Sequence, residues 1–356
     1  MRRNLEDTIK FLDEVWHLNT TAIAYHLDGW DAREGEEATK RTRKSVFLNP
    51  EIMLDEQLSL MKIRSAYPDD RVPFFHPYLG VGVYASAFGC EIIFPENEQP
   101  WTKPLLYLEN ITEVYSLKTP QPQNGLLGKV LEYVNYFQKE KQEYPIRLTD
   151  TQSPIDSASL IMKYEELLIA MYTNPKEVHH LLKMVTELII KFAKLEKSVV
   201  KDFSPNHSPQ IYQPSDWGIC LSDDLIAILS PELYREFALP YVNILSEEFN
   251  GVFIHSCGDF SHNLGNMLKM KNLRGIDFGV TEMPIENIVE KLDGKTLFVC
   301  HLGLNTKLRF NDTFEYLDYV FQRRKSNTHL FVLVPIFSTK GEKIPLDRVS
   351  KILEGK

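Results

Sequence analysis

The sequence predicts an α/β fold: a single (β/α)8 barrel of the TIM type with an elaborated N-terminal region. Short β-rich or apolar runs recur along the 356 residues, and longer helical patterns lie between most of them. The same alternation fits an open doubly wound sheet, but neither G-x-G-x-x-G nor G-x-x-x-x-G-K-[ST] follows the first runs. The runs expected to form the eight barrel strands are residues 20–26, 72–76, 145–150, 209–213, 251–256, 273–278, 296–301 and 329–335.

The helical pattern is clearest over residues 175–200 and 231–249, where apolar residues recur at i, i+3, i+4 and i+7. Both segments begin with proline, which is tolerated in the first helical turn. Ser230 stands ahead of Pro231 and is expected to cap the second helix. No Gly/Ser linker and no second periodicity interrupts the chain, so we expect residues 1–356 to form one domain.

Composition excludes several classes of protein. The 49 acidic and 40 basic residues give a net charge of −9, which argues against a sequence-independent nucleic-acid binder. No apolar run approaches the roughly 20 residues that span a bilayer. The N-terminus mixes Glu, Asp and Lys into its apolar pattern, unlike a secretory signal, so we expect a cytoplasmic protein. Its four cysteines are then reduced thiols, metal ligands or core residues.

A candidate metal site follows the expected fifth strand, since working residues of a barrel lie at the carboxyl ends of its strands. His255 and Cys257 are two residues apart and share a face of an extended strand. An imidazole and a thiolate are ligands that zinc prefers. Taken alone, the pair also fits a loop histidine beside a buried thiol.

Further ligands are expected from the next two strands. Cys300 lies near the end of the seventh strand, Asp277 in the sixth, and Glu282 in the loop that follows the sixth. Together with His255 and Cys257 they offer nitrogen, sulfur and oxygen donors for a zinc site with an exchangeable position. The alternative for Cys300 is a small core residue, the commonest use of a free cysteine.

An acidic segment is expected in the loop after the fourth strand. Asp223 and Asp224 are candidate catalytic acids or bases there, and Trp217 is a candidate substrate-binding residue. The alternative is that Ser222 or Asp223 caps a short helix.

Polar residues also follow the second and third strands. Asp150 is a further catalytic candidate, and Gln152, His76 and Tyr78 are candidates for substrate binding. The alternatives are an N-cap role for Asp150 or Thr151 and a purely structural role for His76. Most aromatic residues of the first third are expected in the core.

Six short segments carry a resemblance to a known family. They are Leu221-Ser222-Asp223-Asp224, Ser230 to Phe237, Leu239-Pro240-Tyr241, Ile254 to Gly258, Asp150 to Asp156 and Asn174 to His179. Together they resemble the uroporphyrinogen decarboxylase superfamily, whose members are barrels of this kind. The segments between residues 221 and 258 are the most specific.

One branch of that superfamily decarboxylates porphyrinogens and uses an arginine-rich segment near the first strand and an aspartate after the second. Here residues 26–30 read His-Leu-Asp-Gly-Trp, and residues 76–80 contain no aspartate. Arginines would be needed to hold several substrate carboxylates as bidentate pairs. The sequence therefore departs from this branch.

The other branch comprises zinc methyltransferases that move a methyl group from a methylated corrinoid to a thiol such as coenzyme M. They use a histidine and a cysteine spaced like His255 and Cys257, a later cysteine and an acidic residue. Residues 334–337, where the later cysteine would stand, read Val-Pro-Ile-Phe, so Cys300 would have to substitute. The resemblance implies zinc as cofactor and a methylcobamide co-substrate on a partner protein, with a corrinoid carrier protein and a homodimer as expected partners.

The leading hypothesis is accordingly a zinc-dependent, corrinoid-linked methyltransferase with a small-molecule thiol substrate. Two alternatives stay open. One is a carboxy-lyase acting on a tetrapyrrole or another carboxylated substrate, with Asp223 or Asp224 as catalyst. The other is a non-catalytic barrel that binds a corrinoid or a partner protein.

Overall fold

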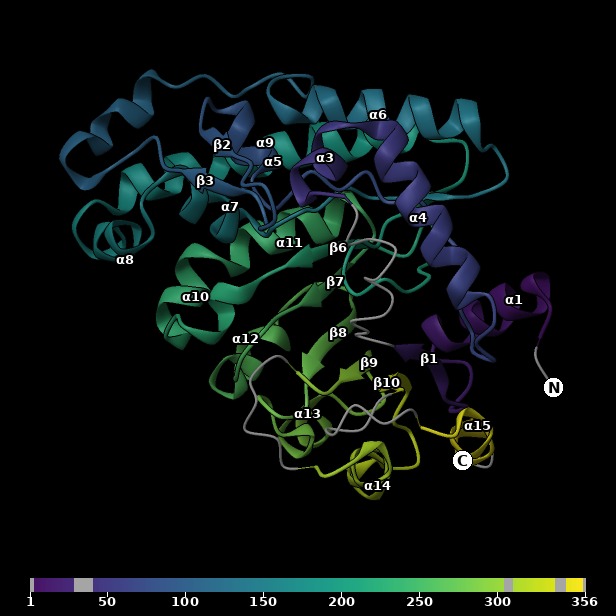
Figure 1. The fold of residues 1–356 in the computed structure, drawn as a ribbon. Coiled ribbons are helices and arrows are strands. Elements are labelled where there is room, and N and C mark those ends of the chain that lie inside the picture. Colours follow the sequence, from purple (N-terminus) through teal and green to yellow (C-terminus); the bar gives the residue numbers. More distant parts are fainter. Residues whose placement is uncertain (1–2, 29–40, 304–309, 337–343, 355–356) are drawn as a thin grey trace.

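The largest sheet of the described residues has six strands in the order β1-β10-β9-β8-β7-β6, and its paired strands are parallel (Figure 1). The computed structural model describes residues 3–28, 41–303, 310–336 and 344–354, so Gly29, Trp30 and Phe337 lie outside the described residues. The strands of this sheet are β1 (Ala24–Asp28), β6 (Ile219–Ser222), β7 (Val252–His255), β8 (Leu273–Gly279), β9 (Leu297–His301) and β10 (Leu330–Pro335).

Short elements continue the sheet beyond β6. Strands β4 (Ile146–Arg147) and β5 (Phe203–Ser204) pair in parallel, and Phe75 forms a bridge to β4. The N–H of Cys220 in β6 donates to the carbonyl of Pro205, which joins β5 to the large sheet. This arrangement is consistent with the predicted TIM-type barrel.

The segment before Phe75 is joined to β1 largely through side chains. Asp70 accepts a hydrogen bond from the N–H of Tyr25 at 3.1 Å, and Asp69 accepts one from the N–H of Leu27 at 2.9 Å. Buried backbone N–H groups need a partner, and these two carboxylates supply it where a regular ladder is missing. Both carboxylates are buried.

Most of the expected strands are present, with two corrections. The run 72–76 is reduced to the single bridge at Phe75, and the expected strand at 209–213 is wrong. Pro209 and Pro214 bound that segment and lack the N–H that a ladder needs, so the chain forms β5 earlier instead. Strand β6 was not predicted and lies inside the segment expected to be a loop.

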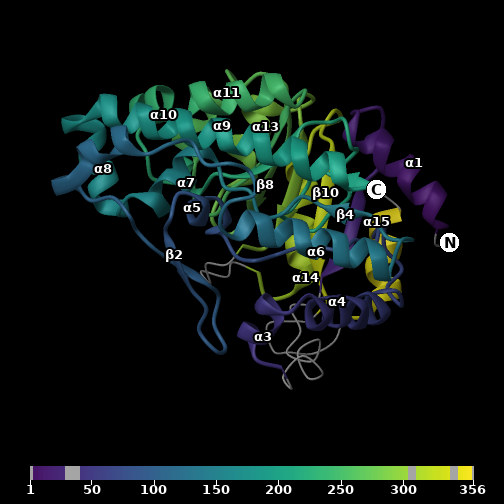
Figure 2. The same cartoon turned by 90° about the horizontal axis from the view of Figure 1, so that it is seen from above.

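Helices follow the strands on the outside of the sheet, and α8 lies on the side of the molecule away from α1 and α15 (Figures 1 and 2). A small antiparallel pair, β2 (Glu91–Ile93) and β3 (Trp101–Lys103), belongs to the elaborated N-terminal region. The helices are α1 (Leu5–Trp16), α3 (Arg43–Leu48), α4 (Pro50–Arg64), α5 (Val83–Ala87), η1 (Leu108–Ser116), α6 (Leu126–Glu140), α7 (Pro154–Ile161), α8 (Tyr164–Thr173), α9 (Pro175–Val199), η2 (Asp224–Ala227), α10 (Pro231–Phe237), α11 (Leu239–Glu248), η3 (Ser261–Asn263), α12 (Leu264–Met267), α13 (Ile285–Leu292), α14 (Thr313–Arg323) and α15 (Leu346–Glu354).

Helix α9 confirms the first predicted helix almost residue for residue. The second is divided into α10 and α11 at Ala238, because Pro240 lacks the N–H that would continue the helix. Ser230 caps α10 as predicted, with its Oγ accepting from the N–H of Leu233 at 3.3 Å.

Two buried clusters occupy opposite faces of the sheet. Phe253, Val299 and Phe331 pack in the cluster that includes Trp16 of α1, and this cluster fills the inner face. Ile254 and Cys300, one residue away in their strands, pack in the larger cluster with the surrounding helices. Side chains of a strand alternate between its two faces, so these clusters show which residues point inward.

Among the described residues, no helix has both the length and the apolar character that crossing a membrane requires.

Candidate metal centre

Three predicted residues come together at the carboxyl ends of β6 and β7. Asp224, His255 and Cys257 each offer one ligand atom, and these atoms all lie within 4.8 Å of one another. The Cys257 Sγ is 3.9 Å from His255 Nε2, and the Cys257 N–H donates to Asp224 Oδ1 at 2.7 Å. One nitrogen, one sulfur and one oxygen donor with an open side suit a catalytic zinc ion, which uses three protein ligands.

Asp277 of β8 holds the imidazole of His255. Its Oδ2 lies 2.5 Å from His255 Nδ1, and the Asp277 side chain is 1% exposed. Burial lowers the pKa of His255, but the bond to Asp277 and the nearby Cys257 thiol outweigh burial and raise that pKa well above its usual value. A carboxylate behind a ligating histidine fixes the ring so that the other nitrogen faces the metal. Asp277 was predicted as a metal ligand, but the structure places its carboxylate behind His255 and outside the group of Asp224, His255 and Cys257.

His301 of β9 supports the same carboxylate from the other side. Its Nε2 is 3.7 Å from Asp277 Oδ2, while its Nδ1 accepts a hydrogen bond from the N–H of Gly303 at 2.9 Å. Because Nδ1 accepts, the ring proton is on Nε2, toward Asp277. His301 was not among the predicted site residues, although period-two alternation from the inward Val299 would have identified it.

Cys300 does not join the ligand group. Its side chain is fully buried in the outer cluster, on the face opposite to Val299 and His301. Burial, followed by the charge of Asp277, raises its thiol pKa well above the usual value, so it suits the alternative of a core residue. The prediction of Cys300 as a ligand therefore chose a residue on the wrong face of β9. Only side chains at positions 299 and 301 point to the inner face at this level.

Glu282 also lies outside the ligand group but contacts its loop. Its Oε2 accepts from the N–H of Gly258 at 3.1 Å, next to Cys257. It therefore helps to fix the backbone that presents the thiol.

Asp223 is part of the scaffold beneath Asp224. Its carboxylate is fully buried, accepts from Ser153 Oγ at 3.1 Å and bonds the hydroxyl of Tyr234. Burial raises the pKa of Asp223 to about 6, while the Tyr234 and Ser153 bonds lower it. The Asp223 N–H also donates to the carbonyl of His255 at 2.8 Å, which ties the loop to β7. Asp224 is the exposed member of the acidic pair and the one that reaches the metal group.

The alternative in which Ser222 or Asp223 caps this loop is wrong, because the accepting side chain is another one. Asp156 of α7, rather than Ser222 or Asp223, accepts the N–H groups of Asp224 at 2.7 Å and Leu225 at 3.1 Å. A remote carboxylate therefore satisfies the first turn of η2 and leaves Asp224 free for other contacts.

Asp150 and Gln152 lie beside the centre and contact each other. Gln152 Nε2 donates to Asp150 Oδ1 at 2.5 Å, and both side chains are buried. The pKa of Asp150 is raised to about 6 by burial, and is lowered in turn by the Gln152 bond and by the charge of His255. The proposed N-cap role passes to Ser153, whose Oγ accepts from the N–H of Asp156. The second oxygen of Asp150, Oδ2, lies 3.8 Å from Nδ1 of His207.

Trp217 is at the other end of the sheet. It precedes β6, so it lies at the amino end, where its Nε1 donates to the carbonyl of Trp16 at 3.0 Å. The ring packs against the tilted ring of His17, with centroids 4.1 Å apart, and against the guanidinium of Arg274. The expected role in substrate binding rested on a loop that is in fact a strand, and the structure separates Trp217 from the candidate centre.

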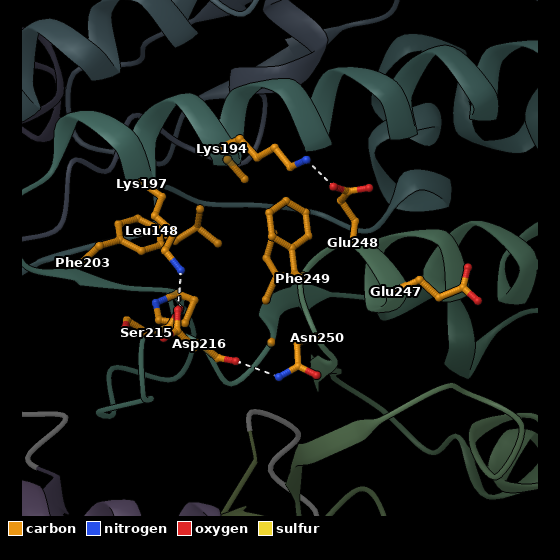
Figure 3. A pocket seen from close by; sticks show the side chains of 14 residues that line it. Leu148, Lys194, Lys197, Phe203, Ser215, Asp216, Glu247, Glu248, Phe249 and Asn250 are labelled. Atoms are coloured by element: carbon orange, nitrogen blue, oxygen red, sulfur yellow. Dashed lines mark hydrogen bonds and ion pairs between the residues drawn. The ribbon is translucent and has the colours of Figure 1, made fainter.

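His76 and Tyr78 line a pocket beside α4, with ring centroids 5.3 Å apart. A larger cavity of about 360 Å³ lies between α9 and α11, and Figure 3 shows its lining. There Lys194 pairs with Glu248 and Lys197 pairs with Asp216. No member of the ligand group lines this cavity, and its charged side chains largely satisfy one another.

The fold and this group together give an α/β barrel in which three side chains that could hold a metal ion lie at the carboxyl ends of the strands. The family model of uroporphyrinogen decarboxylase (URO-D) matches residues 32–196. That range includes the predicted segments in residues 150–179 but not those between 221 and 258. Uroporphyrinogen decarboxylases of Xanthomonas campestris pv. campestris and Xanthomonas axonopodis pv. citri are 24% identical over 220 residues, 58% of this chain. The match spans 55% of their length, so the chain corresponds to about half of these curated relatives.

A solved structure shares the whole fold. A methyltransferase from Methanosarcina mazei matches with a TM-score of 0.66 and 15% identity, over 97% of each chain. At this identity the likeness establishes the fold. The family model and the curated relatives support the resemblance to the uroporphyrinogen decarboxylase superfamily that the sequence predicts.

Proposed function

We propose that the protein is a zinc-dependent methyltransferase that moves a methyl group from a methylated corrinoid to a thiol acceptor. The observation that carries the proposal is the grouping of Asp224, His255 and Cys257, with Asp277 behind the histidine. The methyltransferase among the structural neighbours supports the class of reaction. The corrinoid is proposed to arrive on a partner carrier protein.

The chain's own residues would hold and orient the reacting thiol. Asp277 fixes the His255 ring, and Asp224 and Glu282 fix the backbone around Cys257. Zinc at these ligands would lower the pKa of a bound thiol and keep a thiolate available at neutral pH. The thiolate sulfur would bond to the methyl carbon, and the electron pair of the broken cobalt–carbon bond would stay on the corrinoid.

Zinc analysis of matched cysteine variants tests this proposal. We expect about one zinc per chain in the wild type and in Cys300→Ser, and only traces in Cys257→Ser, because Cys300 points away from the ligands. Methyl transfer from methylcobalamin to 2-mercaptoethanol, followed by the corrinoid absorbance, should fail only in Cys257→Ser. A wild-type protein without zinc, or equal zinc in all three proteins, would refute the assignment.

The curated relatives favour a second candidate, a carboxy-lyase acting on a tetrapyrrole or another carboxylated substrate. Asp150, Asp156 and Asp223 are carboxyl groups near the centre whose pKa is raised by burial. This candidate predicts tetrapyrrole binding that is indifferent to chelators, whereas the methyltransferase loses its activity when zinc is removed.

A further inference from the structure

Two adjoining pockets lie beside α4, with volumes of about 210 and 100 Å³. Both are lined by Met61, Arg64, Phe74, Arg147 and Gln210, and we call them together the arginine pocket. Four arginines, Arg43, Arg64, Arg71 and Arg147, line it against a single carboxylate, Glu56. The lining is therefore cationic, although the chain as a whole carries a net charge of −9.

Arg147 has a buried guanidinium group that is only partly satisfied by the described residues. Its side chain comes from β4, is 3% exposed and lies over the ring of Phe74, with Cζ 4.7 Å from the centroid. Its Nη1 is buried without a hydrogen bond, and no ion pair reaches the guanidinium from the described residues. An uncompensated buried charge costs several kcal/mol, so proteins normally pair it. Burial lowers the pKa of Arg147 to about 9, which leaves the group charged at neutral pH.

Other polar atoms of the same lining are also unsatisfied. Arg71 Nε, Glu56 Oε2 and His76 Nε2 are buried and have no hydrogen-bond partner among the described residues. The second oxygen of Glu56 is engaged by Arg43 at 2.7 Å. Buried polar groups are rarely left without partners, and a concentration of them around one cavity points to a polar ligand.

Strand β4 connects the arginine pocket with the candidate metal centre. Arg147 is the last residue of β4, and Asp150 follows three residues later, with its Oδ2 3.8 Å from Nδ1 of the buried His207. Gln152, which bonds Asp150, forms a bridge to Ser222, and Ser222 pairs with His255 in the sheet. We therefore expect a small molecule bound at Arg147 to extend toward His255.

We propose that the arginine pocket binds the anionic group of the thiol acceptor, a carboxylate, sulfonate or phosphate, with Arg147 as its principal partner. A guanidinium matches such an oxyanion with two parallel hydrogen bonds. Glu56 and His76 remain for a hydroxyl or amino group on the same molecule. The inference rests on the proposed function for the thiol, but binding of the anion itself does not require zinc.

Calorimetric titration with thiol-free anions tests the pocket alone. Propionate, propane-1-sulfonate and propyl phosphate would be titrated into the wild type, Arg147→Gln and Arg323→Gln. Arg323 pairs with Glu286 on the surface and gives the same change of net charge. We expect at least one anion to bind the wild type and Arg323→Gln equally, and at least tenfold more weakly to Arg147→Gln. The anion that binds best identifies the class.

Arg147→Lys is the control for a folding defect in Arg147→Gln. Lysine keeps the positive charge but lacks the two parallel donors of the guanidinium, so we expect an intermediate anion affinity. Anion binding that is the same in Arg147→Gln and wild type, or absent from the wild type, would overturn the inference.

A second titration separates the two proposals. 3-Mercaptopropionate should bind more tightly than 3-mercapto-1-propanol through Arg147, and more tightly than propionate only when zinc is present. If the zinc-dependent gain is missing but the Arg147-dependent gain remains, the proposed function fails and the anion site stands. If only the zinc-dependent gain is found, the anion site fails.

Discussion

The two ends of the sheet are built from the same strands but carry different chemistry. At the amino end, Trp16 and Trp217 pack together, and each indole N–H donates to a carbonyl, at 2.6 and 3.0 Å. At the carboxyl end, imidazoles, carboxylates and a thiol gather around His255. In β7 the change takes two residues: Phe253 packs edge-on against Trp16, and His255 bonds Asp277.

Within β7, Phe253 at the amino end contributes to the packed core, and His255 at the carboxyl end belongs to the candidate metal centre. At the aromatic end both indole N–H groups have partners, and Gln213 Oε1 and Thr296 Oγ1 are buried there without one among the described residues. The carboxyl end and the arginine pocket leave more buried polar atoms without partners, including Asp277 Oδ1, Nη1 of Arg147 and both ring nitrogens of His207. Such groups lower stability unless a ligand satisfies them, so their concentration at the carboxyl end and in the pocket favours a ligand there.

Removing the aromatic anchor should have the largest effect on stability. Trp16 is fully buried against Phe253, so Trp16→Ala is expected to lower the free energy of unfolding by about 3–5 kcal/mol. Urea unfolding measures this. The folded fraction should still hold zinc, and loss of zinc from that fraction would show that the two ends are not independent.

Ionisation of the buried Glu196 of α9 is expected to have a smaller effect on the free energy of unfolding, on the order of 3 kcal/mol. Its carboxylate accepts a hydrogen bond from the N–H of Thr149 at 3.1 Å. Burial raises its pKa from 4.5 to about 8. The folded protein therefore binds more protons than the unfolded chain between these values, so this group's contribution to stability falls as pH rises from about 5 to 8.

Glu196→Gln removes that dependence and should lose less stability between pH 5 and pH 8 than the wild type. Urea unfolding at both values checks the difference. Parallel losses in the two proteins would show that Glu196 does not titrate as described.

The smallest effect is expected behind the ligands. Asp277→Asn keeps the size of the side chain but loses the charge that orients His255, so zinc affinity should fall about 10- to 100-fold. Competition with a chelator of known affinity measures it. Asp216→Asn, at the exposed amino end, is the matched control and should not change the affinity. Equal affinity in Asp277→Asn and wild type would remove Asp277 from the centre.

Sequence reasoning reached His255 and Cys257 because their spacing and their place after a strand are local properties. It interpreted Asp224 as a catalytic acid or base in a loop after residues 209–213, whereas the structure places Asp224 after β6, beside His255 and Cys257. It assigned the ligand of β9 to Cys300, because residue type was given more weight than the period-two alternation that directs His301 inward.

The errors at Trp217 and at residues 209–213 have a common cause. Strand β6 has only four residues, all buried, which is too short for any periodicity to appear. Without it, Trp217 appeared to follow a strand that it actually precedes. The arginine pocket could not be predicted from the sequence, because Arg147 and α4 come together only through tertiary packing.

Zinc X-ray absorption on the purified protein tests the central claim most directly, because it counts the sulfur ligands. The account predicts one sulfur at about 2.3 Å with nitrogen and oxygen donors at about 2.0–2.2 Å, as the group of Asp224, His255 and Cys257 requires. Two sulfurs per zinc would bring Cys300 or another cysteine into the centre, and a zinc ion without sulfur would contradict the site altogether.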